Sequence, residues 1–281
     1  MAPVPLPPRF TADLFRPLNE ELVALLRGLS PDEWHLPTLS RRWRVREVVA
    51  HLLDTHCRRL SFERDGLAPL APGRPIESDG DLVAFLDDVN ARWIAAAERL
   101  SPRLLTDLLE AAGRWLADSL ASLDPFAPAL FPVAWAGESE SRCWFDVARE
   151  LTEQWHHQQQ IRLATGRPLL LERRFSLPVL ETFLRAAPLA YRGVQAPEGT
   201  AVAVELAAPT QAVYSLLVHG GAWRLLAGEA DGWAARVTLD PETAWRVLTR
   251  SLEAEEARAR VRIEGAAELA LPLLDTRAMM V

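Results

Sequence analysis

The stretch Glu150-Leu-Thr-Glu-Gln-Trp-His-His-Gln-Gln-Gln-Ile-Arg162 carries the most informative pattern in this sequence. It is predicted to lie inside a long helix over residues 142–165, which ends at Gly166-Arg-Pro168. Glu153 and His157 are four residues apart, so their side chains stack on one face of that helix. A carboxylate and an imidazole in this arrangement can bind one divalent ion together.

A third ligand is expected from a second predicted helix, over residues 45–64. This helix carries His51 at the edge of its apolar face, and Glu153 and His157 lie at the matching edge of their own helix. Side chains placed in this way can converge at the mouth of a helical bundle. Three protein ligands that leave one position open are typical of a catalytic metal site.

Two other side chains compete with these candidates. Glu150 lies one heptad before His157 and shares its helical face, so it is the main rival of Glu153. His56 lies nearer the centre of its apolar arc than His51, and it is either a buried, hydrogen-bonded residue or an alternative ligand. The spacing alone leaves both choices open.

Apolar periodicity predicts further helices at residues 11–29, 78–100, 103–122 and 172–190. The pattern changes near Gly193. Beyond it, strands are predicted at residues 200–207, 212–218, 223–227, 233–239 and 258–263, and helices at 241–252 and 266–274. The sequence therefore predicts two domains, an all-helical domain over residues 1–190 and a small α+β domain over residues 195–281.

The composition is that of an ordinary globular chain, with 49% hydrophobic and 25% charged residues. No apolar run approaches the length of a membrane span, and the first eight residues do not resemble a signal peptide. We therefore expect a cytoplasmic protein with no membrane partner. The net charge of −7 argues against a nucleic-acid partner. The two cysteines, Cys57 and Cys143, are expected to be free thiols.

Two motifs resemble a known family. Trp43-Arg-Val-Arg-Glu-Val-Val-Ala-His51-Leu-Leu-Asp resembles the second-helix motif of the DinB-like four-helix bundles. The segment from Glu153 to Pro168 resembles the last-helix motif of the mycothiol-dependent maleylpyruvate isomerase branch of that superfamily. The end of the chain, from Val261 to Val281, resembles the small α+β domain of these two-domain proteins, which is itself similar to sterol-carrier domains. The resemblance implies a DinB-like four-helix bundle followed by a small C-terminal α+β domain.

The resemblance also implies a metal site. The His, Glu and His ligands of the family fall on His51, Glu153 and His157. Zn²⁺ is the usual metal of the family, and related bundles bind Ni²⁺ or other divalent ions. The family motif often has an aspartate three residues after the last ligand, where this chain has Gln160. We therefore expect a contact behind the metal ligands to differ.

The function implied by the resemblance is that of a metal-dependent enzyme. A divalent ion with an open position lowers the pKa of a bound thiol. The enzyme would activate a low-molecular-weight thiol, mycothiol or bacillithiol, for isomerisation or S-transfer on a small electrophilic substrate. Family members of the isomerase type also use an arginine of the C-terminal domain, for which Arg246 and Arg250 are candidates.

A non-enzymatic protein that binds a metal and a small ligand or lipid is the alternative. A fourth protein ligand, such as His56, would favour this alternative, because a saturated metal has no position for a substrate. The sequence leaves both a monomer and a homodimer open.

Overall fold

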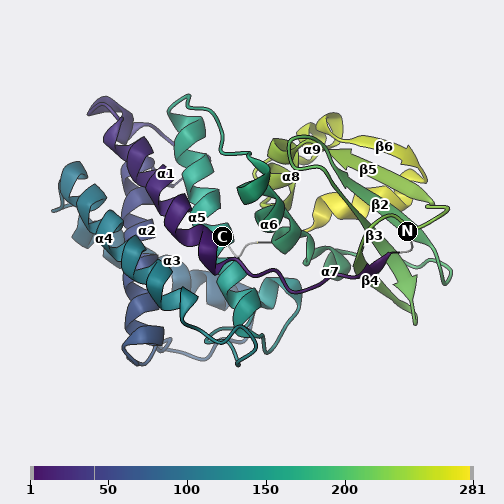
Figure 1. Cartoon of the computed structure of the whole chain (residues 1–281), viewed down its shortest axis with the longest axis horizontal. Coiled ribbons are helices and arrows are strands. Elements are labelled where there is room, and N and C mark those ends of the chain that lie inside the picture. Colours follow the sequence, from purple (N-terminus) through teal and green to yellow (C-terminus); the bar gives the residue numbers. More distant parts are fainter. Residues whose placement is uncertain (1–2, 41, 279–281) are drawn as a thin grey trace. The chain divides into compact units, whose positions relative to one another are not determined.

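The computed structural model describes residues 3–40 and 42–278 (Figure 1). A helical region is followed by a region with a six-stranded sheet, which confirms the predicted fold class. The chain forms two compact units, and each is built from separate segments of the sequence. Among the described residues, no helix combines the length and the apolar character needed to cross a bilayer.

The first unit, called the helical unit here, comprises residues 11–124 and 153–169. Its helices are α1 (Phe15–Arg27), α2 (Val45–Arg59), α3 (Asp79–Ala97), α4 (Pro102–Ala121) and the second half of α5 (Cys143–Ala164). A π-helical turn, Leu60–Arg64, continues α2. The core of this unit draws side chains from all five helices, among them Leu26, Val49, Ala97, Leu105 and Ile161.

Serine residues cap the beginning of two of these helices. The Ser78 side chain accepts a hydrogen bond from the backbone nitrogen of Asp81 at the start of α3. Ser101 does the same for Leu104 at the start of α4, with Pro102 in the first turn. Each serine satisfies a backbone donor that has no partner within its helix. The amphipathic segments therefore begin at defined residues, and their apolar faces meet in one core.

The second unit, called the sheet unit here, comprises residues 3–10, 125–152 and 170–278 of the described chain. Its strands run in the order β1-β4-β3-β2-β5-β6. The β2 strand pairs antiparallel with β3 and parallel with β5. The strands are β1 (Val4–Pro5), β2 (Ala201–Leu206), β3 (Ala212–His219), β4 (Ala222–Ala227), β5 (Ala235–Leu239) and β6 (Arg262–Gly265). The helices, beside the first half of α5, are α6 (Arg173–Leu184), α7 (Ala187–Ala190), α8 (Pro241–Leu248), α9 (Ala254–Arg260) and α10 (Ala267–Ala270).

The strand predicted over residues 258–263 is present but begins four residues later and ends two residues later. Helix α9 occupies residues up to Arg260, and β6 begins only at Arg262. Glu255 and Glu256 lie in the first turn of α9, and Arg258 and Arg260 lie in its last turn. This distribution of charge suits the helix dipole, whereas the alternation of arginine with smaller residues imitates a strand pattern.

The proline-rich beginning of the sequence forms a short edge strand, which the sequence analysis did not predict. Val4 and Pro5 of β1 pair with Ala227 and Leu226 of β4. A proline is tolerated there because an edge strand needs no donor on its open side. Two hydrogen bonds from Arg9, of 2.9 and 2.6 Å, reach the buried carboxylate of Glu181 on α6. The segment before α1 is therefore held in the sheet unit at two points.

The predicted domain boundary coincides with a change of secondary structure. Helix α7 ends at Ala190, and β2 begins at Ala201. The compact units divide the chain differently, because it passes between them after residues 10, 124, 152 and 169. Independent folding of residues 1–190 and 195–281 stays a prediction, since the compactness of a unit does not show that a segment folds alone.

Candidate metal centre

Three side chains from two helices meet in the helical unit. His51 comes from α2, and Glu153 and His157 come from α5. Each offers one ligand atom, and the three atoms all lie within 4.8 Å of one another. The rings of His51 and His157 are buried, while 22% of the Glu153 side chain remains exposed. The structure therefore brings together the three residues that the sequence analysis selected.

The spacing of the ligand atoms fits a small divalent ion. Oε1 of Glu153 lies 3.3 Å from Nε2 of His51 and 3.2 Å from Nε2 of His157. Ligands about 2.0–2.1 Å from a tetrahedral zinc ion lie about 3.3 Å from one another. The same spacing would suit a hydrogen bond, so the protonation of the rings decides which arrangement is present.

Gln160 provides evidence on that protonation. Its Oε1 lies 2.8 Å from Nδ1 of His157, and its Nε2 lies 2.9 Å from Nε2 of His156. With the amide in this orientation, its oxygen accepts a hydrogen bond from Nδ1–H of His157, which fits the tautomer that carries its proton on Nδ1. In the neutral ring, Nε2 then presents a lone pair toward Glu153. This is the tautomer that binds a metal, held by an acceptor behind the ligand.

The predicted change behind the ligands thus takes a definite form. Gln160 stands where the family motif often has an aspartate, and its amide oxygen accepts from His157 in place of a carboxylate. The amide nitrogen of Gln160 has a further partner, because the ring of His156 accepts from it. The ring of His156 lies edge to face with that of His157, with the centroids 5.1 Å apart, and is also connected to the candidate centre through Gln160.

The electrostatic environment favours the protonation states of His51 and Glu153 that can bind a cation. Burial lowers the pKa of His51 to about 4, although its hydrogen bond to Glu153 acts in the opposite direction. Burial alone would raise the pKa of Glu153, but the neighbouring His157 and His51 rings hold it well below its usual range. At neutral pH the cluster therefore contains a carboxylate and a neutral His51 ring, both with lone pairs available.

Trp43 covers the two histidine rings. Its ring centroid lies 4.7 Å from that of His51 and 6.1 Å from that of His157. The two imidazoles themselves meet edge to face, with their centroids 4.8 Å apart. The sequence analysis used Trp43 only as part of a motif. Its contacts restrict the orientation of both rings, so it belongs to the candidate centre.

The two rival ligands lie outside the cluster. Oε1 of Glu150 accepts a hydrogen bond of 2.7 Å from Arg149. His56 is buried, and neither of its ring nitrogens has a hydrogen-bond partner among the described residues. His56 is therefore buried, as one of its two alternatives expected, but neither described side chains nor backbone groups hydrogen-bond its ring. Burial lowers the pKa of His56 to about 4, so the ring stays neutral.

The two candidate arginines belong to the sheet unit. The guanidinium of Arg246, at the end of α8, lies 3.7 Å from Glu242 and 4.0 Å from Glu256. Arg250 follows α8 with a φ of 52°, and its guanidinium lies 3.7 Å from Asp275. The side chain of Arg250 is 54% exposed and that of Arg246 is 12% exposed, so Arg250 is the more accessible. A role for either arginine in binding a substrate stays a prediction.

A helical unit with a His-Glu-His cluster, combined in one chain with a sheet unit, defines a bundle protein with a candidate metal centre. Residues 15–162 match the family model of the mycothiol maleylpyruvate isomerase N-terminal domain. The match spans more than half of the chain, and the protein belongs to this family. The resemblance proposed from the sequence is thereby confirmed.

Two solved structures share the fold. The chain is 14% identical to a mutant of the mycothiol-dependent maleylpyruvate isomerase, with a TM-score of 0.54 over 92% of this chain and 93% of that chain. It is 15% identical to another structure of the mycothiol-dependent maleylpyruvate isomerase, with a TM-score of 0.51 over 87% and 89% of the two chains. At these identities the similarity establishes the fold alone. No curated protein matches the chain.

Proposed function

We propose that this protein is a metal-dependent enzyme that activates a low-molecular-weight thiol. The reaction would be an isomerisation or an S-transfer on a small electrophilic substrate. The observation that carries this proposal is the arrangement of His51, Glu153 and His157, with one oxygen 3.3 and 3.2 Å from two ring nitrogens. The family to which the chain belongs supports mycothiol as the thiol, and bacillithiol is the alternative.

The donor set suits Zn²⁺, and Ni²⁺ also accepts imidazole and carboxylate ligands. When bound, such an ion would lower the pKa of an incoming thiol, so that the thiolate forms near neutral pH. The protein side chains prepare the site for this role. Glu153 is ionised and His51 is neutral before any ligand arrives. Gln160 holds His157 in the required tautomer, and Trp43 restricts the orientation of both rings.

The cysteines of the chain are poor candidates for the reacting thiol. Burial of the sulfur and the nearby carboxylate of Asp54 raise the pKa of Cys57. Cys143 is buried. Reactive cysteines need a lowered pKa and access to solvent, and neither residue has both. An external thiol therefore supplies the nucleophile in this proposal.

An arginine of the sheet unit would bind a carboxylate of the substrate. Arg250 is favoured over Arg246, because the Arg246 guanidinium lies near two glutamates and is mostly buried. A planar guanidinium can hold a carboxylate through two parallel hydrogen bonds.

The metal content of purified variants tests the ligand set. We expect about one divalent ion per chain in the wild type, measured by mass spectrometry. His51→Ala, Glu153→Ala and His157→Ala should each lose most of it. Glu150→Ala is the matched control and should keep it, because Glu150 bonds to Arg149 instead. Full retention of the ion in all three ligand variants would contradict the assignment.

Turnover tests the reaction itself. Mycothiol, bacillithiol and glutathione are each offered together with maleylpyruvate and with other activated alkenes, using metal-loaded protein, metal-stripped protein and a Cys57→Ser, Cys143→Ser double variant. Activity should require the ion and survive the double variant. If metal-loaded protein turns over none of these pairs, the non-enzymatic alternative of a metal- and small-ligand- or lipid-binding protein replaces this proposal.

A further inference from the structure

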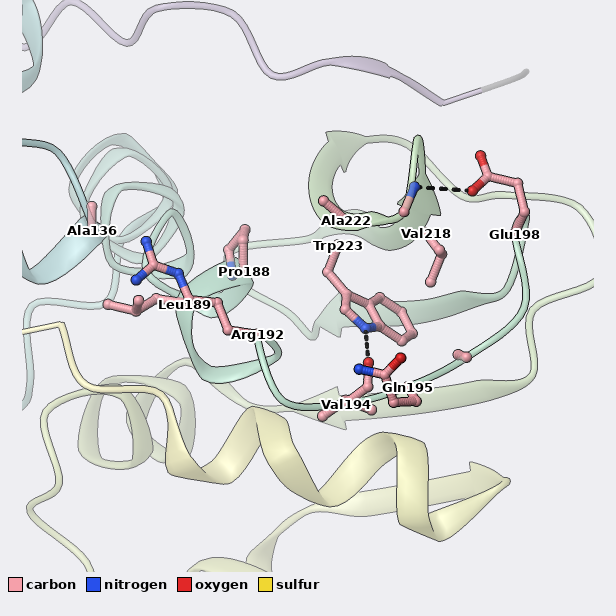
Figure 2. Close-up of a pocket in the computed structure, with 12 residues that line it drawn as sticks. Ala136, Pro188, Leu189, Arg192, Val194, Gln195, Glu198, Val218, Ala222 and Trp223 are labelled. Carbon is pink, nitrogen blue, oxygen red and sulfur yellow. Dashed lines mark hydrogen bonds between the residues drawn. The ribbon is translucent and has the colours of Figure 1, made fainter.

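A cavity of about 450 Å³ lies within the sheet unit and shares no residue with the candidate metal centre. Figure 2 shows the residues that line it. They come from the short 3-10 turn Ala134–Ala136, from α7 and the segment that joins it to β2, and from the β3–β4 hairpin. Its size is that of a small-molecule site rather than of a surface for a macromolecule.

One wall of the cavity is aromatic and held in place. The indole of Trp223 is 8% exposed, and its Nε1 donates a hydrogen bond of 2.9 Å to the backbone oxygen of Val194. The ring of Tyr191 packs against it, with the two centroids 4.9 Å apart. Val218 and Pro188 add aliphatic surface to this wall. This wall is already formed, so an apolar ligand would not have to reorganise it.

Arg192 places a positive charge at the opposite end of the cavity. Figure 2 shows its guanidinium between Ala136 and Leu189. Among the residues that the structure describes, no carboxylate pairs with it. The backbone of Gly137 lies close by, since a Cβ at that position would approach Nη2 of Arg192 to 3.1 Å. The exposed guanidinium of Arg192 therefore lines the cavity without a counter-ion among the described residues.

The acidic residue of the lining does not neutralise this charge. Glu198 accepts hydrogen bonds from the backbone nitrogens of Gly220 and Gly221, at 2.8 and 3.3 Å. Figure 2 shows its carboxylate directed to this hairpin turn and away from Arg192. These two hydrogen bonds lower the pKa of Glu198. Its carboxylate therefore stays ionised and bonded to the backbone of the turn.

We propose that this cavity binds a small carboxylate with an apolar body. The carboxylate pairs with Arg192, and the body packs along the aliphatic residues toward Trp223. A guanidinium offers two parallel donors to a carboxylate. A ligand that covers the apolar wall gains binding free energy, because the apolar surface of the wall is removed from water. An inorganic anion would leave the wall exposed, and a neutral apolar molecule would leave the charge without a partner. This binding site is additional to the proposed thiol chemistry.

Isothermal titration of the metal-loaded, full-length protein with octanoate tests the proposal. Octanol and inorganic phosphate serve as the apolar-only and anion-only probes. We expect saturable binding of one octanoate, with octanol and phosphate at least ten-fold weaker. Arg192→Met keeps the aliphatic stem and should weaken octanoate at least ten-fold. Arg258→Met is the matched control, because Arg258 is an exposed arginine of α9 outside the cavity, and it should bind octanoate like the wild type.

A second variant tests the cavity without touching the charge. Ala222 lines the cavity from an exposed position on β4, and Ala222→Phe should fill part of the space. We expect this variant to lose octanoate binding at an unchanged melting temperature. Octanoate binding of wild-type strength in both the Arg192 and Ala222 variants would overturn the proposal. Phosphate binding as tight as octanoate would also overturn it, since the apolar wall would then contribute nothing.

Discussion

At the residue scale, one amide group connects two imidazoles. Gln160 accepts from His157 through its oxygen and donates to His156 through its nitrogen. We expect Gln160→Leu to weaken Zn²⁺ binding by about 10–100-fold, because His157 loses the acceptor that fixes its tautomer. Competition with a chromophoric chelator measures this affinity. Gln160→Glu keeps an acceptor and should restore most of the affinity, whereas equal affinities in all three proteins would show that the amide has no role.

His56 is a buried ring that predicts a pH effect. Its pKa is lowered to about 4 in the folded protein, against 6.5 for a free imidazole. Between these values the unfolded chain binds a proton that the folded chain does not, so the free energy of unfolding falls as the pH decreases from about 6.5 to about 4. The expected loss for this one ring is about 3 kcal/mol.

Urea unfolding of the metal-free protein between pH 7 and pH 4 measures this effect. His51 and His156 have lowered pKa values as well, so the wild type should lose stability through several rings. His56→Leu should reduce the pH dependence by about one proton. Identical pH profiles in the wild type and His56→Leu would contradict the prediction.

The candidate site could be predicted from the sequence only in part. The i, i+4 spacing of Glu153 and His157 follows from helix geometry, and the edge position of His51 predicted which helix would approach them. The role of Gln160 could not be foreseen, because an amide can donate or accept until the positions of both rings are known. The contact of Trp43 with His51 depends on the path of the chain before α2, which periodicity does not determine.

At the element scale, α1 and α4 approach closely at Gly113. A Cβ at this position would lie 2.2–2.6 Å from the amide of Asn19, which is itself buried. Alanine is the better helix former by about 1 kcal/mol, so the clash and the propensity oppose each other in Gly113→Ala. A double-mutant cycle separates the two effects. We expect the change in the free energy of unfolding caused by Gly113→Ala to be more favourable in an Asn19→Ala background than in the wild type, by at least about 1 kcal/mol.

Chemical denaturation of the four proteins of the cycle gives this coupling energy. Additive effects of the two substitutions would show that α4 moves away from α1 at little cost. Ala112→Gly, at the neighbouring buried position, is the reference for helix propensity without the contact to Asn19.

The elements differ in how far the sequence predicted them. α4 and α5 agree with their predicted ranges to within about two residues, because serine caps and a terminal glycine mark their ends. The region of α9 and β6 was misjudged, because alternating charges can suit a helix as well as a strand. β1 has two residues and no periodicity, and its partner in β4 is more than 200 residues away. Such a pairing depends on tertiary packing and has no local signal.

At the scale of the whole molecule, Arg9 ties the beginning of the chain to α6. Its partner Glu181 has a side chain that is 3% exposed and also accepts a hydrogen bond of 3.0 Å from Tyr214. Arg9→Met would leave the Glu181 carboxylate buried without the ion pair and hydrogen bonds that now offset the loss of its hydration. We expect the free energy of unfolding to fall by about 1–3 kcal/mol. This loss is smaller than that for breaking a fully buried ion pair, because Arg9 is partly exposed and Arg185 lies 3.7 Å from Glu181.

Arg16→Met is the control for this measurement. Its ion pair with Asp118 is exposed on both sides, and we expect a change below about 0.5 kcal/mol. An equal loss in the free energy of unfolding in both variants would show that the buried Arg9–Glu181 contact contributes no more to stability than an exposed ion pair.

We also propose that the predicted domains separate at residues 191–200. Limited proteolysis there should release a fragment of residues 1–190, near 21 kDa (about 190 residues at roughly 110 Da each). The two pieces should stay together on gel filtration, because α6 and α7 belong to the compact unit that contains the sheet. A first cut within the exposed loop of residues 66–77 would contradict the proposed junction.

The pairing of β1 with β4 has a consequence during biosynthesis. Val4 lies opposite Ala227, so the ribosome must add more than 200 residues before this edge of the sheet can close. At about 5–20 residues per second, the wait lasts between about 10 and 45 seconds. Throughout that time the first segment of the nascent chain is exposed to chaperones and proteases without its native partner. Arg9 and Pro5 would then be incorporated late, after α1 to α5 have already emerged.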